Sequence, residues 1–569
     1  MNAHEKHVKG MVVNLFPRIL FRTYAKHHPT RSSVFRTNTR KLLIAGSTVT
    51  FTIILYNTNE KFHDSIRHAS LTTKRVSVVG QATLRCIYHY KKVLNKKFKD
   101  QDLRTIELNK THKRCALITL HALERNGGVF IKLGQHIGAM SYMLPKQWTE
   151  TMTPLQDKCP ESKFEDINQM FIDDLGVGIN QLFSQFNKVP IGVASLAQVY
   201  TGEMRNSGEK VAIKCQHPEL KEFVPLDVWL TKTVFSLLNV VFPEYPLKWL
   251  SDELQSSIYN ELDFRQEAKN AKRTSEYFKD FTKLTALRIP RVIRSDSRIL
   301  IMEYIGGKRL DDLNYMDSHG ISRSEVSSCL SHIFNNMIFT PGVGLHCDPH
   351  GGNLAIRRCE KTKERPYNFE IILYDHGLYR YPETQMRRDY AKFWLALLDQ
   401  DEVSMRKYAK KFAKITDKQF PLFAAAVTGR SIDIALHYDI SKRRGQDEVR
   451  TMTMGLLEGT FLSDIMNILS RIPRIVLLIL KTNDLTRFLD ETLDNPLGPE
   501  RTFLIMTQYC AKTVYDEKCE INDSQCTGLT WVWHKCVNWI NFQRRKDQLY
   551  LYDFILWWRS FVFGLFRYI

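Results

Sequence analysis

The stretch LHCDPHGGN, residues 345–353, gathers side chains that could do chemistry. Its His, Cys and Asp residues are all metal-ligand types, so a zinc site, as in a metallohydrolase, is one hypothesis. Asp348 and Asn353 also have the spacing of a phosphoryl-transfer loop, in which the aspartate accepts or orients a hydroxyl proton and the asparagine oxygen binds metal. Zinc is the weaker hypothesis, because Pro349 interrupts the run and no second His/Cys cluster of matching spacing exists.

Phosphoryl transfer also needs a second carboxylate and a phosphate-binding lysine. FEIILYDHGL (369–378) predicts an apolar strand that ends in a turn at Asp375, where a carboxylate can hold Mg²⁺. Residues 189–204 predict a strand, a loop of small residues and a second strand, and VAIK then ends at Lys214. Backbone N–H groups of such a loop would cover phosphates, and Lys214 would contact them as a fixed positive charge.

A lysine in that position needs a carboxylate on a neighbouring helix. Residues 257–278 predict one long helix, on which Asp263 and Glu267 share a face while Glu261 lies well off it. One of these carboxylates is therefore expected to pair with Lys214, and Glu261 to do something else.

Residues 288–312 predict a strand pair followed by MEYIGG, which is similar to the last strand and hinge of a kinase N-lobe. Met302 would occupy the gatekeeper position, and the backbone of Glu303 to Ile305 would contact adenine. Lysine, aspartate, asparagine and the second aspartate then follow one another in the order that kinase chemistry requires.

Charge separates the front of the chain from its body. The net charge is +20; residues 1–41 carry +8, residues 57–114 carry +9, and the remainder is nearly neutral. A basic front end on a neutral body indicates targeting and membrane-surface contact. No RNP-like, zinc-finger or basic-zipper pattern occurs, which argues against a nucleic-acid partner. The eleven cysteines form no CxxC pair, which argues against a disulfide framework.

Three segments suggest how the chain meets a membrane. Residues 1–41 have the composition of a mitochondrial transit peptide, and residues 42–58 are seventeen uncharged, mostly apolar residues, long enough for one transmembrane helix. Arg40 and Lys41 on its N-terminal side predict that the bulk of the chain faces the intermembrane space. Residues 59–104 predict a basic helical connector, and residues 549–569 an aromatic interfacial tail.

These motifs resemble those of the UbiB family, the aarF domain-containing atypical kinases, over roughly residues 105–400. KLGQ (132–135) matches the family's KxGQ signature, GVASLAQVY its alanine-rich loop, ELDFRQEA its ExD motif, and DPHGGN its DPHPGN loop with Gly352 replacing proline. DHG in place of DFG is similar to the branch that includes the first mammalian aarF domain-containing kinase. The residues to which the resemblance gives nucleotide-site roles are Lys132, Gln135, Ala194, Ser195, Lys214, Glu261, Asp263, Glu267, Met302, Glu303, Ile305, Asp348, Asn353 and Asp375.

The resemblance implies an α+β, two-lobed protein-kinase-like fold with an N-terminal helical extension that carries KxGQ. The extension would span 105–184, the N-lobe 185–306 and the C-lobe 307–548. ATP and Mg²⁺ are the implied cofactors, with Lys214, Glu267 and Asp348 catalytic and Asn353 and Asp375 on the metal. The implied partners are mitochondrial membrane lipids, with ubiquinone or its precursors among them.

Two functions of different classes remain open at this point. The first is an atypical kinase or ATPase of the mitochondrial inner membrane that acts in lipid or coenzyme Q homeostasis. The second is a non-catalytic, nucleotide-gated lipid carrier or scaffold. The complete set of expected ligands favours the enzyme.

Overall fold

The computed structural model of the chain describes residues 59–138, 144–156, 159, 161–243, 248–347, 351–428, 472–495 and 498–566. The predicted transit peptide and transmembrane helix lie outside the described residues, and so does Asp348. The chain divides into two compact units, Met1–Lys74 and Arg75–Ile569. Both lobes and the candidate site belong to the second unit.

A run of helices precedes the first strand and forms the helical extension. They are α3 (Glu60–Leu94), α4 (Gln101–Asn126), α5 (Val129–Gly138), α6 (Lys146–Met152), α7 (Phe164–Leu175) and α8 (Ile179–Leu182). Tyr90 on α3 ties three of them together, because its hydroxyl lies 2.7 Å from His112 Nδ1 on α4 and accepts from Trp148 Nε1 on α6 at 2.9 Å.

Helix α5, which carries the KxGQ signature, is wedged between the lobes. Its residues Phe130, Leu133 and Ile137 are buried in the core that also contains C-lobe residues, while Val129 packs against helix α9 of the N-lobe. A Cβ at Gly134 would overlap the Leu155 side chain, so the glycine of KxGQ permits this close packing.

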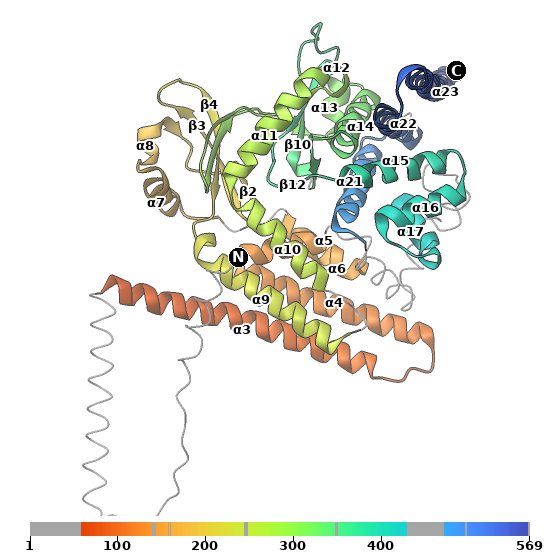
Figure 1. Ribbon diagram of the computed structural model, residues 1–569. Helices are drawn as coiled ribbons and strands as arrows, with labels where there is room; N and C mark the ends of the chain where they lie inside the picture. The colour runs from red at the N-terminus through yellow and green to blue at the C-terminus, as the bar shows by residue number, and fades with distance from the viewer. Residues whose placement is uncertain are drawn as a thin grey trace, which may run out of the picture. The chain divides into compact units, whose positions relative to one another are not determined.

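The N-lobe is an antiparallel sheet in the order β1-β3-β4-β7-β6, with β2 paired to β3. Its strands are β1 (Phe183–Phe186), β2 (Gly192–Val193), β3 (Ala197–Met204), β4 (Lys210–Gln216), β6 (Val292–Ser295) and β7 (Ile299–Glu303). Side chains alternate along β4: Val211, Ile213 and Cys215 pack toward α7, while Ala212 and Lys214 face the opposite side, where α11 lies across the sheet (Figure 1).

The helices inserted between β4 and β6 differ from the prediction. The single helix expected over 257–278 is two helices, α10 (Lys248–Glu261) and α11 (Phe264–Phe278), preceded by α9 (Leu220–Val241). Gln216 Nε2 donates to the Leu262 carbonyl at 3.0 Å, and the Phe264 N–H donates to the Ser297 carbonyl at 3.1 Å. These bonds to other elements replace intrahelical ones and break the helix at Asp263.

Among the described residues, α9 is the one helix long and apolar enough to cross a membrane. Asp227 near its middle is buried and accepts two hydrogen bonds from Arg75 on α3, at 3.0 and 2.5 Å. Val224 and Val228 of α9 belong to a buried apolar cluster. These contacts show that one side of α9 packs against the protein, while Trp229 and Val240 on α9 are exposed.

The C-lobe is mainly helical around the buried helix α14 (Arg323–Phe339). It also contains a small sheet in the order β5-β11-β10-β8 and the strand pair β9–β12. The strands are β5 (Leu287–Arg288), β8 (Lys308–Arg309), β9 (Leu345–His346), β10 (Leu354–Arg358), β11 (Phe369–Leu373) and β12 (Tyr379–Arg380). The other helices are α12 (Thr282–Thr285), α13 (Leu313–Ser318), α15 (Thr384–Leu398), α16 (Glu402–Ala413), α17 (Phe420–Thr428), α21 (Arg474–Thr492), α22 (Gly498–Gln525) and α23 (Gly528–Phe566).

The predicted α+β, two-lobed kinase-like fold with a helical extension is confirmed. Three predicted segment boundaries nevertheless fall inside structural elements: 104/105 lies within α4, 184/185 within β1, and 548/549 within α23. The first two boundaries follow from the family resemblance and the third from composition, whereas helices and strands end where their backbone hydrogen bonds end.

Candidate functional site

Lys214 lies at the centre of a buried group of charges. Its Nζ is 2.7 and 2.9 Å from the two carboxylate oxygens of Glu267 on α11 and 3.3 Å from Asp375 Oδ2. Burial alone would lower the pKa of Lys214, but the carboxylates of Asp375 and Glu267 outweigh it and hold the pKa above its usual range. The ammonium is therefore a fixed positive charge, held forward by α11.

Glu267 is the buried partner of that lysine. Its side chain is 3% exposed, and burial raises its pKa to about 7 against the opposing ammonium of Lys214. Glu267 thus ionises within the physiological pH range, and the strength of its ion pair with Lys214 depends on pH.

Asp375 follows β11 in the predicted Asp-His-Gly turn. Its Oδ1 accepts from the Gly377 N–H at 2.7 Å, and its side chain is 37% exposed, far more than that of Glu267. Burial opposes ionisation, but the Lys214 ammonium and the Gly377 N–H hold the pKa of Asp375 below its usual range. The result is an ionised, accessible carboxylate of the kind that binds a hard divalent cation.

Asn353, the other predicted metal ligand, ends the short 3-10 turn Gly351–Asn353 just before β10. Its carbonyl accepts from the Tyr374 N–H at 3.0 Å, which places the backbone of this turn beside the start of the Asp375 turn. Asp348 lies outside the described residues, so its predicted role as proton acceptor stays a prediction.

A second lysine–carboxylate pair joins the helical extension to the same turn. Lys132 Nζ on α5 lies 2.7 Å from Glu261 Oε2 at the end of α10, and both side chains are largely buried. A Cβ built on Gly377 would lie 3.6 Å from Glu261 Cγ, so the pair sits against the Asp375 turn. The positive charge of Lys132 also helps to keep the pKa of Asp375 low.

Gln135 connects α5 to the alanine-rich loop. Ser195 Oγ donates to Gln135 Oε1 at 3.2 Å, and Gln135 Nε2 donates to the Leu155 carbonyl at 2.9 Å. Within the loop, the Ala194 N–H donates to the Ala197 carbonyl at 2.7 Å. The loop predicted to cover phosphates is therefore bonded to the KxGQ helix.

Asp263 does not join this group of charges. It caps the N-terminus of α11 by accepting from the Arg265 N–H, and its carboxylate binds the Arg265 side chain at 2.9 and 3.1 Å. This interaction lowers the pKa of Asp263. The expectation that Asp263 and Glu267 share one helical face is wrong, because the helix begins only at Phe264.

The predicted adenine-binding segment follows β7. Met302 is 8% exposed and pairs with Ala212 of β4. The Glu303 carboxylate accepts from Arg288 of β5 at 2.6 Å. Ile305 is buried, and its carbonyl accepts from the Tyr374 hydroxyl at 2.9 Å, which ties the hinge to the residue before Asp375.

Three residues that the motif reasoning did not select position this machinery. His346 Nε2 donates to the Asp375 carbonyl at 2.9 Å, and Asn270 Nδ2 donates to the His376 carbonyl at 2.9 Å. Both residues are buried, so His346 on β9 and Asn270 on α11 hold the backbone of the Asp375 turn in place. For His346, the sequence favours a loop-packing or backbone-bonded group over a metal ligand, and its bond to the Asp375 carbonyl agrees with that prediction.

His217 is the third such residue, and it holds the alanine-rich loop. Its Nε2 donates to the Ala194 carbonyl at 2.9 Å, and its Nδ1 accepts from the Ser162 hydroxyl at 2.7 Å. Burial lowers the pKa of His217, so the imidazole is neutral at pH 7 and keeps this tautomer.

Asp348 and His350, two of the four ligand types in the zinc hypothesis, lie outside the described residues. Among the residues that the structure describes, no group of three His, Cys, Asp or Glu side chains could hold a metal ion. His346 points at a backbone carbonyl, and His376 is stacked on Tyr379. What the geometry provides instead is two lysines held by carboxylates, an ionised and partly exposed carboxylate at Asp375, and a small-residue loop bonded to the helix that carries Lys132. That combination can bind and orient a phosphorylated ligand.

Fold and site together define a protein-kinase-like chain with a helical extension, and the comparisons with known proteins agree. Residues 154–409 match the family model described as ABC1 atypical kinase-like domain. The chain is 64% identical over 559 residues to the ABC1 family protein MCP2 of Saccharomyces cerevisiae, covering 96% of this chain and 98% of that protein.

More distant relatives have the same character. The Schizosaccharomyces pombe homolog of MCP2 is 41% identical over 512 residues, 89% of this chain and 91% of that protein. The AarF domain-containing kinase 1 of Drosophila melanogaster is 33% identical over 470 residues, 81% of this chain and 88% of that protein. The chain therefore belongs to the ABC1 family of atypical kinase-like proteins, as its UbiB/aarF resemblance predicted.

Proposed function

We propose that this chain is an atypical kinase or ATPase of the mitochondrial inner membrane that binds Mg-ATP and acts in lipid or coenzyme Q homeostasis. The observation that carries the proposal is the meeting of Lys214, Glu267 and Asp375, with nitrogen–oxygen distances of 2.7 and 3.3 Å. A lysine held by one buried carboxylate and facing a second, partly exposed one is the arrangement that phosphate and metal binding require.

The donor set fits Mg²⁺ and a nucleotide. Asp375 is ionised and accessible, and Asn353 ends the neighbouring turn, so these two residues would hold the metal ion. Mg²⁺, when bound, would neutralise phosphate charge. Lys214 would contact the α- and β-phosphates, and the loop at Ala194 and Ser195 would cover them.

The remaining roles extend this assignment. Asp348 would accept or orient the proton of an attacking hydroxyl or water. Met302 and the backbone of Glu303 to Ile305 would contact adenine. Membrane lipids, with ubiquinone or its precursors among them, are the proposed substrates or partners, since the chain's basic front end suits an anionic membrane.

A nucleotide-gated lipid carrier or scaffold is the second candidate, and one feature favours it. Helix α5 is bonded to the alanine-rich loop through Gln135 and Ser195, and to the Asp375 turn through Lys132 and Glu261. Nucleotide binding could therefore shift the position of the helical extension through these contacts, without any phosphoryl transfer.

The deciding experiment separates turnover from biological activity. Lys214→Arg and Asp375→Asn are tested for ATP turnover, with and without membranes, and for rescue of a strain that lacks the endogenous protein. Matched controls are Lys210→Arg, at the exposed start of β4, and Asp280→Asn, at an exposed surface position. Loss of both turnover and rescue supports the enzyme; full rescue without turnover establishes the scaffold.

The proposed topology has its own test. The chain is expected in the inner membrane with a single pass and its bulk in the intermembrane space. Protease should therefore digest the body of the chain once the outer membrane is opened, while the inner membrane is intact. Protection in such mitoplasts would place the body in the matrix and contradict the proposal.

A further inference from the structure

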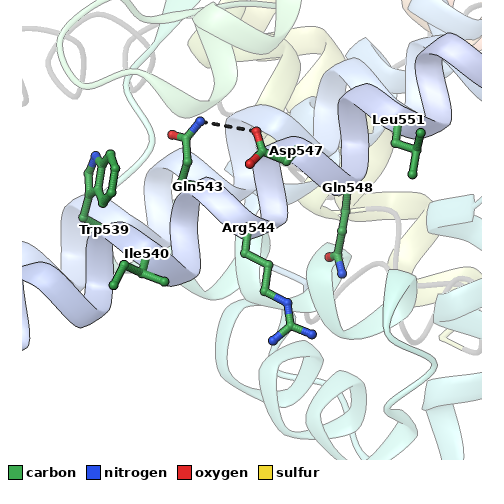
Figure 2. A pocket seen from close by; sticks show the side chains of 7 residues that line it. All are labelled: Trp539, Ile540, Gln543, Arg544, Asp547, Gln548 and Leu551. Carbon is green, nitrogen blue, oxygen red and sulfur yellow. Dashed lines mark hydrogen bonds between the residues drawn. The ribbon is translucent and has the colours of Figure 1, made fainter.

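Helix α23 exposes an unusual amount of apolar surface. Large hydrophobic side chains between 42% and 89% exposed occur along it from end to end. They are Leu529, Val532, Trp533, Trp539, Ile540, Tyr550, Leu551, Tyr552, Phe554, Ile555, Trp557 and Trp558. Figure 2 shows part of this outward side, with Trp539, Ile540 and Leu551 projecting from one helix. Apolar surface on this scale marks an interaction site.

The opposite side of α23 is fixed against the C-lobe. Leu549 is 2% exposed, and Phe542 stacks on Tyr515 of α22 with ring centroids 4.6 Å apart. Arg545 binds Asp399 at the end of α15 at 2.6 Å. Helices α22 and α23 lie side by side (Figure 1), so the direction in which the apolar residues point is set by packing.

The C-terminal part of this surface is too broad for a single partner helix. Of the nine residues from Tyr550 to Trp558, all but Asp553 and Leu556 are exposed. At about 100° per residue, the exposed positions cover well over half of the helix circumference. A helix that packs on another protein helix buries a narrower stripe, of about 100°. A bilayer can surround so wide an arc.

The chemistry of the exposed arc suits a membrane interface. Tyr550, Tyr552, Trp557 and Trp558 are residue types enriched where headgroups meet hydrocarbon. The one acid among them, Asp553, is turned inward and lies 3.1 Å from Arg501 of α22. No acidic side chain therefore faces outward over the last turns described.

Charges nearer the middle of α23 fit an anionic surface. Lys535 and Arg544 are exposed, and Lys546 lies near the Tyr550 ring. The exposed acid there is Asp547, which accepts from Gln543 Nε2 at 3.3 Å (Figure 2). Cations thus outnumber acids on this side, as expected for contact with anionic headgroups.

We propose that Tyr550–Trp558 of α23 docks onto the surface of an anionic phospholipid bilayer. This would be a second membrane contact, separate from the N-terminal segment, and would hold the C-lobe at the headgroup level. The inference deepens the proposed membrane function and rests on it only for the identity of the membrane. It does not depend on nucleotide binding.

A local probe tests the docking in the full chain, where an N-terminal anchor would make simple co-sedimentation uninformative. An environment-sensitive fluorophore is attached at Leu551→Cys in a Cys536→Ser background, since Cys536 is an exposed native thiol. The matched control carries the probe at Val240→Cys on α9, which is 77% exposed. The protein is reconstituted in phosphatidylcholine vesicles with about 20 mol % cardiolipin.

We expect the Leu551 probe to shift to shorter wavelength, to be quenched by nitroxide lipids and to be shielded from aqueous iodide. The Val240 probe should stay fully accessible to iodide. Replacing Trp557 and Trp558 together with serine should return the Leu551 probe toward the control, whereas Trp229→Ser on α9 should not. A Leu551 probe as accessible as the Val240 probe would overturn the proposal.

Two further outcomes separate the rival explanations. Concentration-dependent dimers without lipid, abolished by Trp558→Asp, would identify a second copy as the occupant and reject the bilayer. Nucleotide affinity is measured on the same serine variant and should equal that of the unmodified chain. If the unmodified chain binds no nucleotide but the probe is shielded, the proposed function fails and the docking stands.

Discussion

Glu267→Gln removes one negative charge from the partner of Lys214 while leaving the shape of the side chain almost unchanged. In the structure, Lys214 donates to both oxygens of Glu267 and also contacts Asp375 at 3.3 Å. Without the Glu267 charge, we expect the ammonium to turn toward Asp375. One change would then misplace the phosphate-binding lysine and occupy the metal-binding carboxylate.

The size of the effect follows from these contacts. A hydrogen bond to a charged group contributes about 1.5–3 kcal/mol. Because Lys214 keeps Asp375 as a partner, we expect a loss of about 2 kcal/mol in Mg-ATP binding, which corresponds to an affinity about 30-fold lower. The assay is titration of the full chain with a non-hydrolysable ATP analogue and Mg²⁺ at a pH of about 8, above the pKa of Glu267.

The pH dependence gives the prediction its direction. The pKa of Glu267 in the folded protein is raised to about 7, so the carboxylate is charged above that pH and neutral below it. The ion pair between Glu267 and Lys214 is therefore present above pH 7 and is lost as the pH falls through that value. The unmodified chain should lose affinity on acidification, and the glutamine variant should lose less, so that the two converge.

Glu276→Gln is the matched control, because Glu276 is an exposed residue of the same helix α11. This control variant keeps every other titrating group of the Glu267→Gln variant, including the phosphates of the nucleotide. The reasoning is refuted if Glu267→Gln, with unchanged thermal stability, binds Mg-ATP as tightly as the control at the higher pH.

Other predictions concern the charges around the site. Lys132→Met leaves Glu261 buried without its cation and should lower the free energy of unfolding by about 3 kcal/mol in urea titrations. Lys132→Arg keeps the positive charge and should retain most of the stability. Equal stability of the two variants would show that the ion pair does not stabilise the fold. Asp227→Asn should lower the free energy of unfolding by a similar amount, because it weakens the bidentate bond from Arg75. A loss below about 0.5 kcal/mol would contradict the packing of this side of α9 on α3. Burial lowers the pKa of His376 to about 3, so the unfolded chain binds a proton below its ordinary pKa that the folded chain does not. As the pH falls, the free energy of unfolding should decrease more steeply in the unmodified chain than in His376→Phe, by up to about 1.4 kcal/mol per pH unit. Identical slopes for the two proteins would count against a neutral His376.

Much of the fold and of the candidate site could be predicted from local sequence motifs. VAIK placed Lys214 on a strand, and alternation along β4 turns that side chain toward α11. The Asp375 turn follows a continuous apolar strand, β11, as FEIIL predicts. Each of these inferences needs a few neighbouring residues only, and periodicity reports such arrangements well.

The rest depended on partners far away in the sequence. ELDF contains neither Pro nor Gly, and the local signal for a new helix start is Asp263 itself, a favoured N-cap residue. Contacts with Gln216 and Ser297 of other elements accompany the break. The His346 side chain likewise bonds a carbonyl twenty-nine residues later in the chain. Composition predicts a separate aromatic tail from residue 549, whereas α23 continues through that residue without interruption.

The measurement that tests the central claim most directly is nucleotide binding by the full chain with and without Mg²⁺, compared between the unmodified protein, Asp375→Asn and the surface control Asp280→Asn. The account predicts that Mg²⁺ strengthens binding of an ATP analogue to the unmodified protein and to the control, and that Asp375→Asn loses this strengthening. Binding to Asp375→Asn that responds to Mg²⁺ as the unmodified protein does would contradict the assignment of the site.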